Sequence, residues 1–565
     1  MIKHILYTAV SLLLTSITTA QYNPYRYEIQ RKVICEQGAV VSAHPLASKV
    51  GVSILKQGGN SFDAAIATQL ALAVVYPGAG NIGGGGFLLG YTAKGETVAL
   101  DYREKAPASA TRDMYLDAAG NAQTQLSQNG HLASGVPGTV AGLFSTLKYA
   151  KLPFKQLIQP AIELAEKGFV ITESEARALN ATMQSFVLYN TQPNAFVKYG
   201  GWKAGDTLIQ KDLAKTLERI RDGGQKGFYE GTTAALIVAE MKRGGGMITL
   251  DDLKAYQAVE RKAMRSAYKG FAILGMPLPS SGGIIIEQVL GMTAPYHIGS
   301  MGFHSAEAVQ LMIEAERRAY ADRASLLGDM DFVKVPVQAI TSENYLKARM
   351  SDYQKGKAGN SEGTKAGMPA PESEETTHLA AYDAAGNAVA VTTTLNGGYG
   401  SRTVVGGAGF LLNNEMDDFS IKAGVPNMYG AVGSTANAIA PGKRMLSSMT
   451  PTIVLKDEKP YLIIGTPGGT TIPTSVFQTI VNLIDFKLSS EDAVWKPKFH
   501  HQWLPDVVYV EKGFPQETAD KLKQMGYKIV ERGAIGRTEL IKIEKGKIEA
   551  VADNRGDDHA EGFQP

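Results

Sequence analysis

The alternation of apolar and polar residues predicts a β-hairpin in the last third of the chain. One extended run covers 377–382, and a second run, rich in Val and Thr, starts at Ala388. Gly and Asn tolerate the positive φ of a tight reversal. The two runs are therefore expected to pair across a turn built from Asp383, Gly386 and Asn387.

Longer periodic segments predict the rest of the framework. The segment 60–76 is rich in Ala and Leu behind cap-like Asn60 and Ser61, which predicts a buried helix. Ser305 caps a second predicted helix in a mainly helical region that extends from about 138 to 350. That helix covers 306–327, and strands are predicted at 32–41, 87–91, 388–391 and 452–455.

The hairpin places two threonines opposite each other. Symmetric pairing about Ala385 brings Thr376 across from Thr394, and directly opposed side chains have Cβ atoms about 4.5–5.5 Å apart, close enough for one hydroxyl to bond the other. The preceding segment, 351–375, consists mostly of Gly, Ser, Pro, Lys and Glu. Because it has little to bury, we expect an exposed, mobile loop.

Cleavage between Glu375 and Thr376 would turn this threonine into a nucleophile with its own base. An α-amine has a pKa of about 7.7–8.0, so near neutral pH part of it is unprotonated and can accept a proton. A threonine activated by its own N-terminal amine is an established nucleophile arrangement. Read alone, this segment favours the alternative of an ordinary threonine-rich strand after a disordered loop.

Composition limits the functions that the chain supports. With 565 residues, 44% of them hydrophobic, it can bury a large core. The formal net charge is +2 and no basic stripe is present, which argues against nucleic-acid binding. Cys35 is the only cysteine, so no internal disulfide can form, and we expect it to be a small buried residue in the strand 32–41.

Residues 1–20 have the pattern of a secretory signal peptide. A short positive region with Lys3 precedes an apolar stretch, 5–14, and small residues end at Ala20. We expect cleavage before Gln21 and export to the periplasm or the medium, with an uncleaved anchor as the alternative. The apolar stretch is short for a transmembrane helix, and no later segment has an apolar run of membrane length.

Two motifs point to other chemistries. Gly78–Gly83 matches GxGxxG and Asp101 follows about 20 residues later, but a helix precedes it and a strand follows, the reverse of a dinucleotide site. Close backbone packing explains these glycines better.

A zinc site is the alternative suggested by His378, His500 and His501. No HExxH motif or cysteine set accompanies these histidines, so structural roles fit them better. We therefore expect no metal and no organic cofactor.

Several longer motifs follow one another in a defined order. They are Asn81–Phe87, Asp101–Pro107, Ala133–Gly138, Pro279–Gly283, Thr376–His378, Thr394–Asn396, Asn413–Ser420, Pro441–Pro451, Gly465–Gly469 and Phe499–Trp503. In this order they closely resemble the γ-glutamyltransferase (γ-glutamyl transpeptidase) family of N-terminal-nucleophile hydrolases. The resemblance covers nearly the whole mature chain.

The resemblance implies a fold and an activity. The implied fold is α+β, a four-layer αββα sandwich with helices outside two stacked antiparallel sheets. Self-cleavage would give a large subunit, 21–375, and a small catalytic subunit, 376–565, which remain a heterodimer and one folding unit. The Thr376 hydroxyl would attack a γ-glutamyl amide such as glutathione and pass the γ-glutamyl group to water or to an amino acid or peptide.

The same resemblance assigns roles to further residues. Arg103 would bind the α-carboxylate of the substrate, because a planar guanidinium suits a carboxylate better than neighbouring Lys105 does. Thr394 would orient the nucleophile. The remaining expectations are an oxyanion hole at Gly468 and Gly469, Ser447 and Ser448 on the α-carboxylate, Asp418 on the α-ammonium with help from Asn396 and Glu415, and a lid at 418–430 closed by Tyr429.

Two other functions remain open at this level. One is a related acylase that acts on β-lactam side chains or polyglutamate and differs in its pocket residues. The other is a secreted binding protein that keeps the fold without cleavage. Taken alone, the charged cluster around Arg103 also fits a surface ion-pair group, and Gly468 and Gly469 also fit a plain turn.

Overall fold

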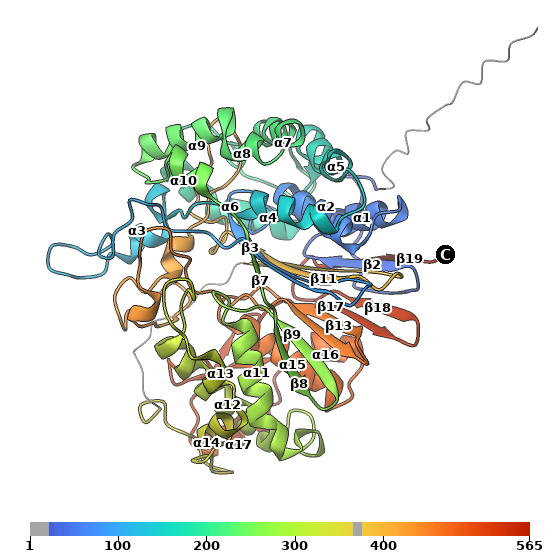
Figure 1. The fold of residues 1–565 in the computed structure, drawn as a ribbon, viewed down its shortest axis with the longest axis vertical. Helices are drawn as coiled ribbons and strands as arrows, with labels where there is room; N and C mark the ends of the chain where they lie inside the picture. Colours follow the sequence, from blue (N-terminus) through green and yellow to red (C-terminus); the bar gives the residue numbers. More distant parts are fainter. Residues whose placement is uncertain (1–21, 365–375) are drawn as a thin grey trace, which may run out of the picture.

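Two seven-stranded antiparallel sheets form the centre of the computed structural model, which describes residues 22–364 and 376–565 (Figure 1). The β10 sheet has the order β19 (His559–Phe563), β2 (Gly38–Ser42), β10 (Thr377–Asp383), β11 (Ala388–Thr394), β3 (Gly85–Tyr91), β4 (Thr97–Asp101) and β7 (Val259–Arg261). The β13 sheet has the order β1 (Lys32–Cys35), β18 (Lys547–Val551), β17 (Glu539–Glu544), β13 (Lys459–Gly465), β12 (Thr452–Lys456), β9 (Phe271–Gly275) and β8 (Met264–Tyr268).

The alternation of side chains along the strands explains why the two sheets stack. Successive strand residues point to opposite faces. Ala380 and Ala390 of the β10 sheet share a buried cluster with Ile463 of the β13 sheet, so these residues lie between the sheets. Val389 and Leu462, one position along, pack into separate clusters with helices. Both faces of each sheet are therefore apolar and covered.

Helices cover the outer faces of both sheets (Figure 1). Over the β10 sheet lie α1 (Pro45–Lys56), α2 (Ser61–Val75), α4 (Thr139–Thr146) and α5 (Phe154–Lys167), with α6 (Glu173–Leu188), α7 (Lys211–Gly223), α8 (Lys226–Tyr229), α9 (Gly231–Gly244) and α10 (Leu250–Ala255) beyond them. Against the β13 sheet lie α11 (Gly282–Thr293), α12 (Ala306–Leu326), α15 (Thr471–Ile484), α16 (Ser490–Trp495) and α17 (Gln516–Gln524). The predicted four-layer αββα architecture is confirmed.

The smaller elements lie around this sandwich. They are α3 (Thr124–Gln128), α13 (Val337–Ile340), α14 (Glu343–Arg349), a three-stranded sheet of β14 (Phe499–His500), β15 (Val508–Glu511) and β16 (Ile529–Arg532), and the pair β5 (Phe169–Val170) and β6 (Thr207–Leu208).

Both predicted helices begin where their caps place them. The Asn60 side chain accepts a hydrogen bond from the Asp63 N–H, and the Asp63 carboxylate accepts one from the Asn60 N–H, a capping box that starts α2. Every residue of α2 is buried, as predicted. The Ser305 hydroxyl accepts from the Ala308 N–H at the start of α12.

The single strand predicted at 32–41 is wrong. The chain forms two strands, β1 and β2, that belong to different sheets, because β1 pairs with β18 and β2 pairs with β10. The chain crosses from one sheet to the other at residues 36 and 37. Because the residues on both sides of this crossing are mostly apolar, the sequence pattern does not show that the strand is interrupted. Cys35 is buried as predicted, and its Sγ lies 3.3 Å from the Gly38 carbonyl oxygen.

Each sheet combines strands from both sides of residue 375. The hairpin β10–β11 lies between β2 and β3, with Ala380 paired to Val41 and Val391 paired to Leu88. In the other sheet β12 pairs with β9. Neither 22–364 nor 376–565 therefore completes a sheet without the other segment.

The loop before the hairpin is only partly described. Residues 351–364 are largely exposed, as predicted, but buried Ser361 anchors them: its N–H donates to Asp506 at 2.9 Å, and the Trp503 indole donates to its carbonyl at 3.0 Å. The rest of the predicted loop, the predicted cleavage residue Glu375 and the predicted signal peptide lie outside the described residues. Within the described ranges, no helix has the length and apolar character needed to cross a membrane.

Candidate active site

The hairpin sets the two threonines side by side. Thr377 pairs with Thr393, and the register continues symmetrically to the turn, as predicted. Thr376 precedes β10 directly, is only 4% exposed, and its Oγ1 lies 3.5 Å from the Thr394 Oγ1. The Asn396 N–H donates to the Thr394 hydroxyl at 2.8 Å. This bond fixes the Thr394 hydroxyl beside that of Thr376, where either oxygen could donate to the other.

The glycine-rich segment after α2 holds the end of β11. The Asn81 side-chain amide donates to the Thr394 carbonyl at 2.8 Å and to the Thr393 hydroxyl at 3.1 Å. At Gly84 an added Cβ would collide with the Thr394 carbonyl oxygen. Since α2 precedes this segment and β3 follows it, the prediction that these glycines serve close backbone packing is confirmed. The supporting role of Asn81 was not predicted from the sequence.

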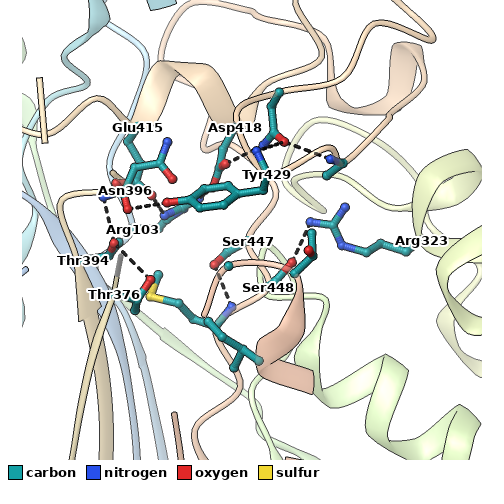
Figure 2. Close-up of a pocket in the computed structure, with 16 residues that line it drawn as sticks. Arg103, Arg323, Thr376, Thr394, Asn396, Glu415, Asp418, Tyr429, Ser447 and Ser448 are labelled. Carbon is teal, nitrogen blue, oxygen red and sulfur yellow. Dashed lines mark hydrogen bonds and ion pairs between the residues drawn. The ribbon is translucent and has the colours of Figure 1, made fainter. Parts of the chain in front are cut away.

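A cavity with about 320 Å³ of atom-free space opens beside Thr376 (Figure 2). The structure brings the predicted site residues together here: Arg103, Thr376, Thr394, Asn396, Glu415, Asp418, Tyr429, Ser447, Ser448 and Gly469 all line the cavity. Gly468 adjoins it in sequence. Arg323 and Asn427 also line the wall and were not predicted.

Arg103 is the centre of a buried charge cluster. Its guanidinium is 1% exposed and forms ion pairs with Glu415 and Asp418. It also donates to the carbonyl oxygens of Met445 and Leu446, both at 3.3 Å. The alternative of a surface ion-pair group at Arg103 is therefore wrong.

Three buried carboxyl groups share this one guanidinium. Glu104 Oε2 lies 3.7 Å from Arg103 Nη1. Burial raises the pKa of Glu104 to about 7 and raises the pKa values of Glu415 and Asp418, while Arg103 opposes each shift. Arg103, with Arg323 acting on Asp418, therefore offsets only part of the burial of these three carboxyl groups.

Gly468 and Gly469 form a turn at the start of α15. Their φ angles are +134° and +53°, a region that favours glycine. Within the described chain, neither N–H donates to a protein acceptor. The N-terminus of a buried helix adds partial positive charge at this position. The turn therefore offers backbone donors for a developing negative charge.

The segment after Asp418 closes one wall of the cavity. Tyr429 is buried and its hydroxyl donates to the Asn396 carbonyl, with its ring beside the cavity (Figure 2). An added Cβ at Gly469 would lie 2.5 Å from the Tyr429 ring. The Asn427 side chain donates to Asp418 at 2.9 Å and so ties this segment to the charge cluster.

Two serines lie opposite the nucleophile. The Ser447 hydroxyl accepts from the Met449 N–H at 3.1 Å, and the Ser448 hydroxyl accepts from Arg323 at 2.9 Å. Arg323 comes from α12, three residues after Tyr320 and on the side that sequence periodicity marks as apolar. A charge on that face is the signal that could have identified it.

The three histidines have structural partners. His378 bonds the Thr392 hydroxyl at 2.9 Å, and His501 bonds Asp506 at 3.2 Å. Burial lowers the pKa values of His378 and His500 to about 3 and that of His501 to about 4, so all three are neutral near pH 7. Over the described ranges, no three His, Cys, Asp or Glu side chains are grouped to hold a metal ion.

Comparison with known proteins identifies the family. The Gamma-glutamyltranspeptidase family model matches residues 47–563. The chain belongs to the γ-glutamyltranspeptidase family. It is 48% identical over 551 residues to the glutathione hydrolase proenzyme of Escherichia coli K12, covering 96% of this chain and 95% of that protein. It is 46% identical over 526 residues to the glutathione hydrolase proenzyme of Pseudomonas aeruginosa, covering 92% and 93%.

Solved structures confirm the fold of this γ-glutamyltranspeptidase-family chain. The crystal structure of a cephalosporin acylase from Bacillus halodurans superimposes with a TM-score of 0.84 at 27% identity, covering 97% of this chain and 100% of that chain. The fold is the α+β sandwich of N-terminal-nucleophile hydrolases. Because an acylase shares it, the activity must be argued from the cavity rather than from the fold.

Proposed function

We propose that this protein is a self-processing γ-glutamyltransferase and hydrolase that acts on glutathione and related γ-glutamyl compounds. The observation that carries the proposal is the charge pattern of the cavity beside Thr376, which contains two guanidinium groups and two carboxylates. An α-amino acid head group has both an ammonium and a carboxylate, and it matches such a pattern. The names of the E. coli and P. aeruginosa relatives support glutathione as a donor.

Activation is a cleavage of the chain before Thr376. The Thr376 hydroxyl attacks the carbonyl carbon of Glu375, and the peptide C–N bond breaks as an ester forms. Water hydrolyses this ester, which leaves a carboxylate on Glu375 and a free α-amine on Thr376. The products, 21–375 and 376–565, remain a heterodimer because both sheets combine strands from the two segments.

Catalysis uses the new amine as the base. It takes the proton from the Thr376 hydroxyl, which Thr394 orients, and the oxygen attacks the γ-glutamyl carbonyl carbon. The N–H groups of Gly468 and Gly469 stabilise the oxyanion, and losing one such donor typically costs about 10²–10³-fold in rate. The leaving amine receives the proton. Water or the amine of an acceptor amino acid or peptide then attacks the γ-glutamyl ester and releases Thr376.

Substrate binding replaces ion pairs within the protein by ion pairs between the protein and the substrate. Glu415 and Asp418, assisted by Asn396, receive the α-ammonium, while Arg103 receives the α-carboxylate together with Ser447 and Ser448. Within the protein Arg103 pairs with both carboxylates. The zwitterionic head group therefore enters without changing the net charge of the cavity, which avoids burying an unpaired ion. Tyr429 and the segment 418–430 form the lid over the bound head group.

Processing and turnover test the proposal together. Wild-type protein should show two chains on a denaturing gel, with one fragment beginning Thr-Thr-His-Leu, and should release nitroaniline from a γ-glutamyl anilide. Thr376→Ala should remain one chain and release none. A single active chain, or a different new N-terminus, would overturn the mechanism.

A second donor separates this function from an acylase. The glutaryl anilide lacks the α-ammonium but keeps the rest of the acyl chain. A γ-glutamyltransferase that uses Asp418 and Glu415 should prefer the γ-glutamyl anilide strongly. Equal or better turnover of the glutaryl compound would assign the protein to the acylases.

We also propose that the protein is exported, from the signal pattern of residues 1–20. Fractionation of cells that express the full chain tests this. Activity in the periplasm or medium, with residues 1–20 removed, is the expected result.

A further inference from the structure

We propose that Arg323 is a positioning residue that directs the Ser448 hydroxyl toward the α-carboxylate of the γ-glutamyl donor. This inference rests on the proposed function, because it needs an α-carboxylate in the cavity beside Thr376. Arg323 reaches the cavity from α12, a helix that contributes no other residue to its lining.

The guanidinium of Arg323 is buried and held by two hydroxyls. The side chain is 8% exposed; its Nη2 donates to Ser448 at 2.9 Å and its Nε donates to Ser281 at 3.1 Å (Figure 2). The Ser281 hydroxyl in turn donates to the Ser447 carbonyl at 2.7 Å. Arg323 is therefore fixed against the backbone that carries both serines.

The electrostatic situation of Arg323 differs from that of Arg103. Arg103 forms ion pairs with Glu415 and Asp418. None of the ion pairs among the described residues involves Arg323. Asp418 acts on Arg323 only from beyond ion-pair distance, and a buried cation so weakly compensated is costly unless a ligand supplies a closer anion. The substrate α-carboxylate is such an anion at this cavity.

The bond from Arg323 fixes the direction of the Ser448 proton. A hydroxyl has one proton and two lone pairs, and arginine can only donate. Arg323 therefore occupies a lone pair of Ser448, and no acceptor in the described chain takes the Ser448 proton. Ser447 is arranged in the same way, because its hydroxyl accepts from the Met449 N–H. Both serines are set to donate to one anion in the cavity.

A double-mutant cycle of Arg323→Gln and Ser448→Ala separates positioning from a general structural role. A hydrogen bond to a charged group is worth about 10- to 100-fold in an equilibrium constant. Arg323→Gln should therefore lower kcat/KM for the γ-glutamyl anilide by about 10- to 100-fold in the wild-type background. Most of this loss should appear in KM, because the α-carboxylate is bound in both ground and transition states. In the Ser448→Ala background the same change should have little further effect.

Equal losses in the two backgrounds, or no loss in the wild-type background, would overturn the inference. Arg349→Gln is the matched control. Arg349 forms an ion pair at 3.1 Å with Asp322, which lies next to Arg323 in α12, and Arg349 does not line the cavity. It should leave kcat/KM unchanged, and a loss equal to that of Arg323→Gln would assign the effect to the helix and overturn the inference.

Chain processing checks that each variant is folded. If Arg323→Gln is not processed, the cycle is run with Arg323→Lys. Lysine keeps the charge but lacks the planar guanidinium that donates to Ser281 and Ser448 together. Equal losses in the two backgrounds, or no loss in the wild-type background, would again overturn the inference. Wild-type protein without processing or turnover would reject the proposed function. If wild-type protein is active but the losses in kcat/KM from Arg323→Gln and Ser448→Ala are additive, only the role of Arg323 is rejected.

Discussion

Replacing Thr394 by valine tests whether its hydroxyl orients the nucleophile. Valine keeps the shape of threonine and replaces its hydroxyl by a methyl group. That oxygen lies 3.5 Å from the Thr376 Oγ1 and accepts the Asn396 N–H at 2.8 Å. Thr394→Val therefore removes one contact to the reacting group and one acceptor of a buried backbone donor.

The lost acceptor for Asn396 affects stability, whereas the lost contact to Thr376 affects the rate of catalysis. The Asn396 N–H is buried, and losing its acceptor should cost about 1–3 kcal/mol of stability. The contact to Thr376 is long at 3.5 Å, but such bonds tighten as the reaction proceeds. Its loss should lower kcat by about 10- to 100-fold, the value of one hydrogen bond to a group that gains charge. KM should change little, because Thr394 orients the nucleophile rather than the amino acid head group.

Nitroaniline release from the γ-glutamyl anilide measures kcat and KM. The stability change is measured as a denaturant midpoint in the single-chain Thr376→Ala background, because a processed heterodimer does not unfold as one chain. Thr394→Ser is the matched control, since it keeps the hydroxyl and should stay within a few-fold of wild type. A wild-type kcat in Thr394→Val, or an equal fall in Thr394→Ser, would refute the orienting role.

Two further predictions concern buried groups around the site. Burial raises the pKa of Glu104 to about 7 from its ordinary 4.5, so the folded protein binds more protons and loses stability as pH rises between these values. Glu104→Gln should remove the part of this slope that Glu104 contributes, while Glu415 and Asp418, whose pKa values are also raised, keep theirs. Denaturant midpoints measured at pH 5 and pH 8 in the single-chain Thr376→Ala background check it; an unchanged slope would contradict the assignment. An added Cβ at Gly465 would overlap the buried His378 ring, so Gly465→Ala should cost about 1–3 kcal/mol. The combined change with His378→Ala should cost less than the sum of the two single changes, and additive costs would contradict the contact.

Local features of this protein could be predicted from its sequence. The hairpin register follows from a turn whose residues, Asp383, Gly386 and Asn387, fix where the chain reverses. The starts of α2 and α12 follow from cap residues that bond N–H groups within three positions. Such interactions depend on neighbours along the chain, so the residue pattern is enough to place them. The candidate residues themselves came from a family resemblance rather than from these patterns.

The tertiary structure decided which of these residues meet and which charges are buried. Arg103 and Glu415 are 312 positions apart, and they meet because β4, which precedes Arg103, and β11, which precedes Glu415, belong to the same sheet. Tertiary packing also decided the crossing from β1 to β2, the support of Thr394 by Asn81 beside the β11–β3 pair, and the contact of Arg323 in α12 with Ser448. The sequence determines strands, caps and turns because they are settled by adjacent residues. Burial and ion pairing depend on which distant segments pack together, so they are settled only in the folded chain.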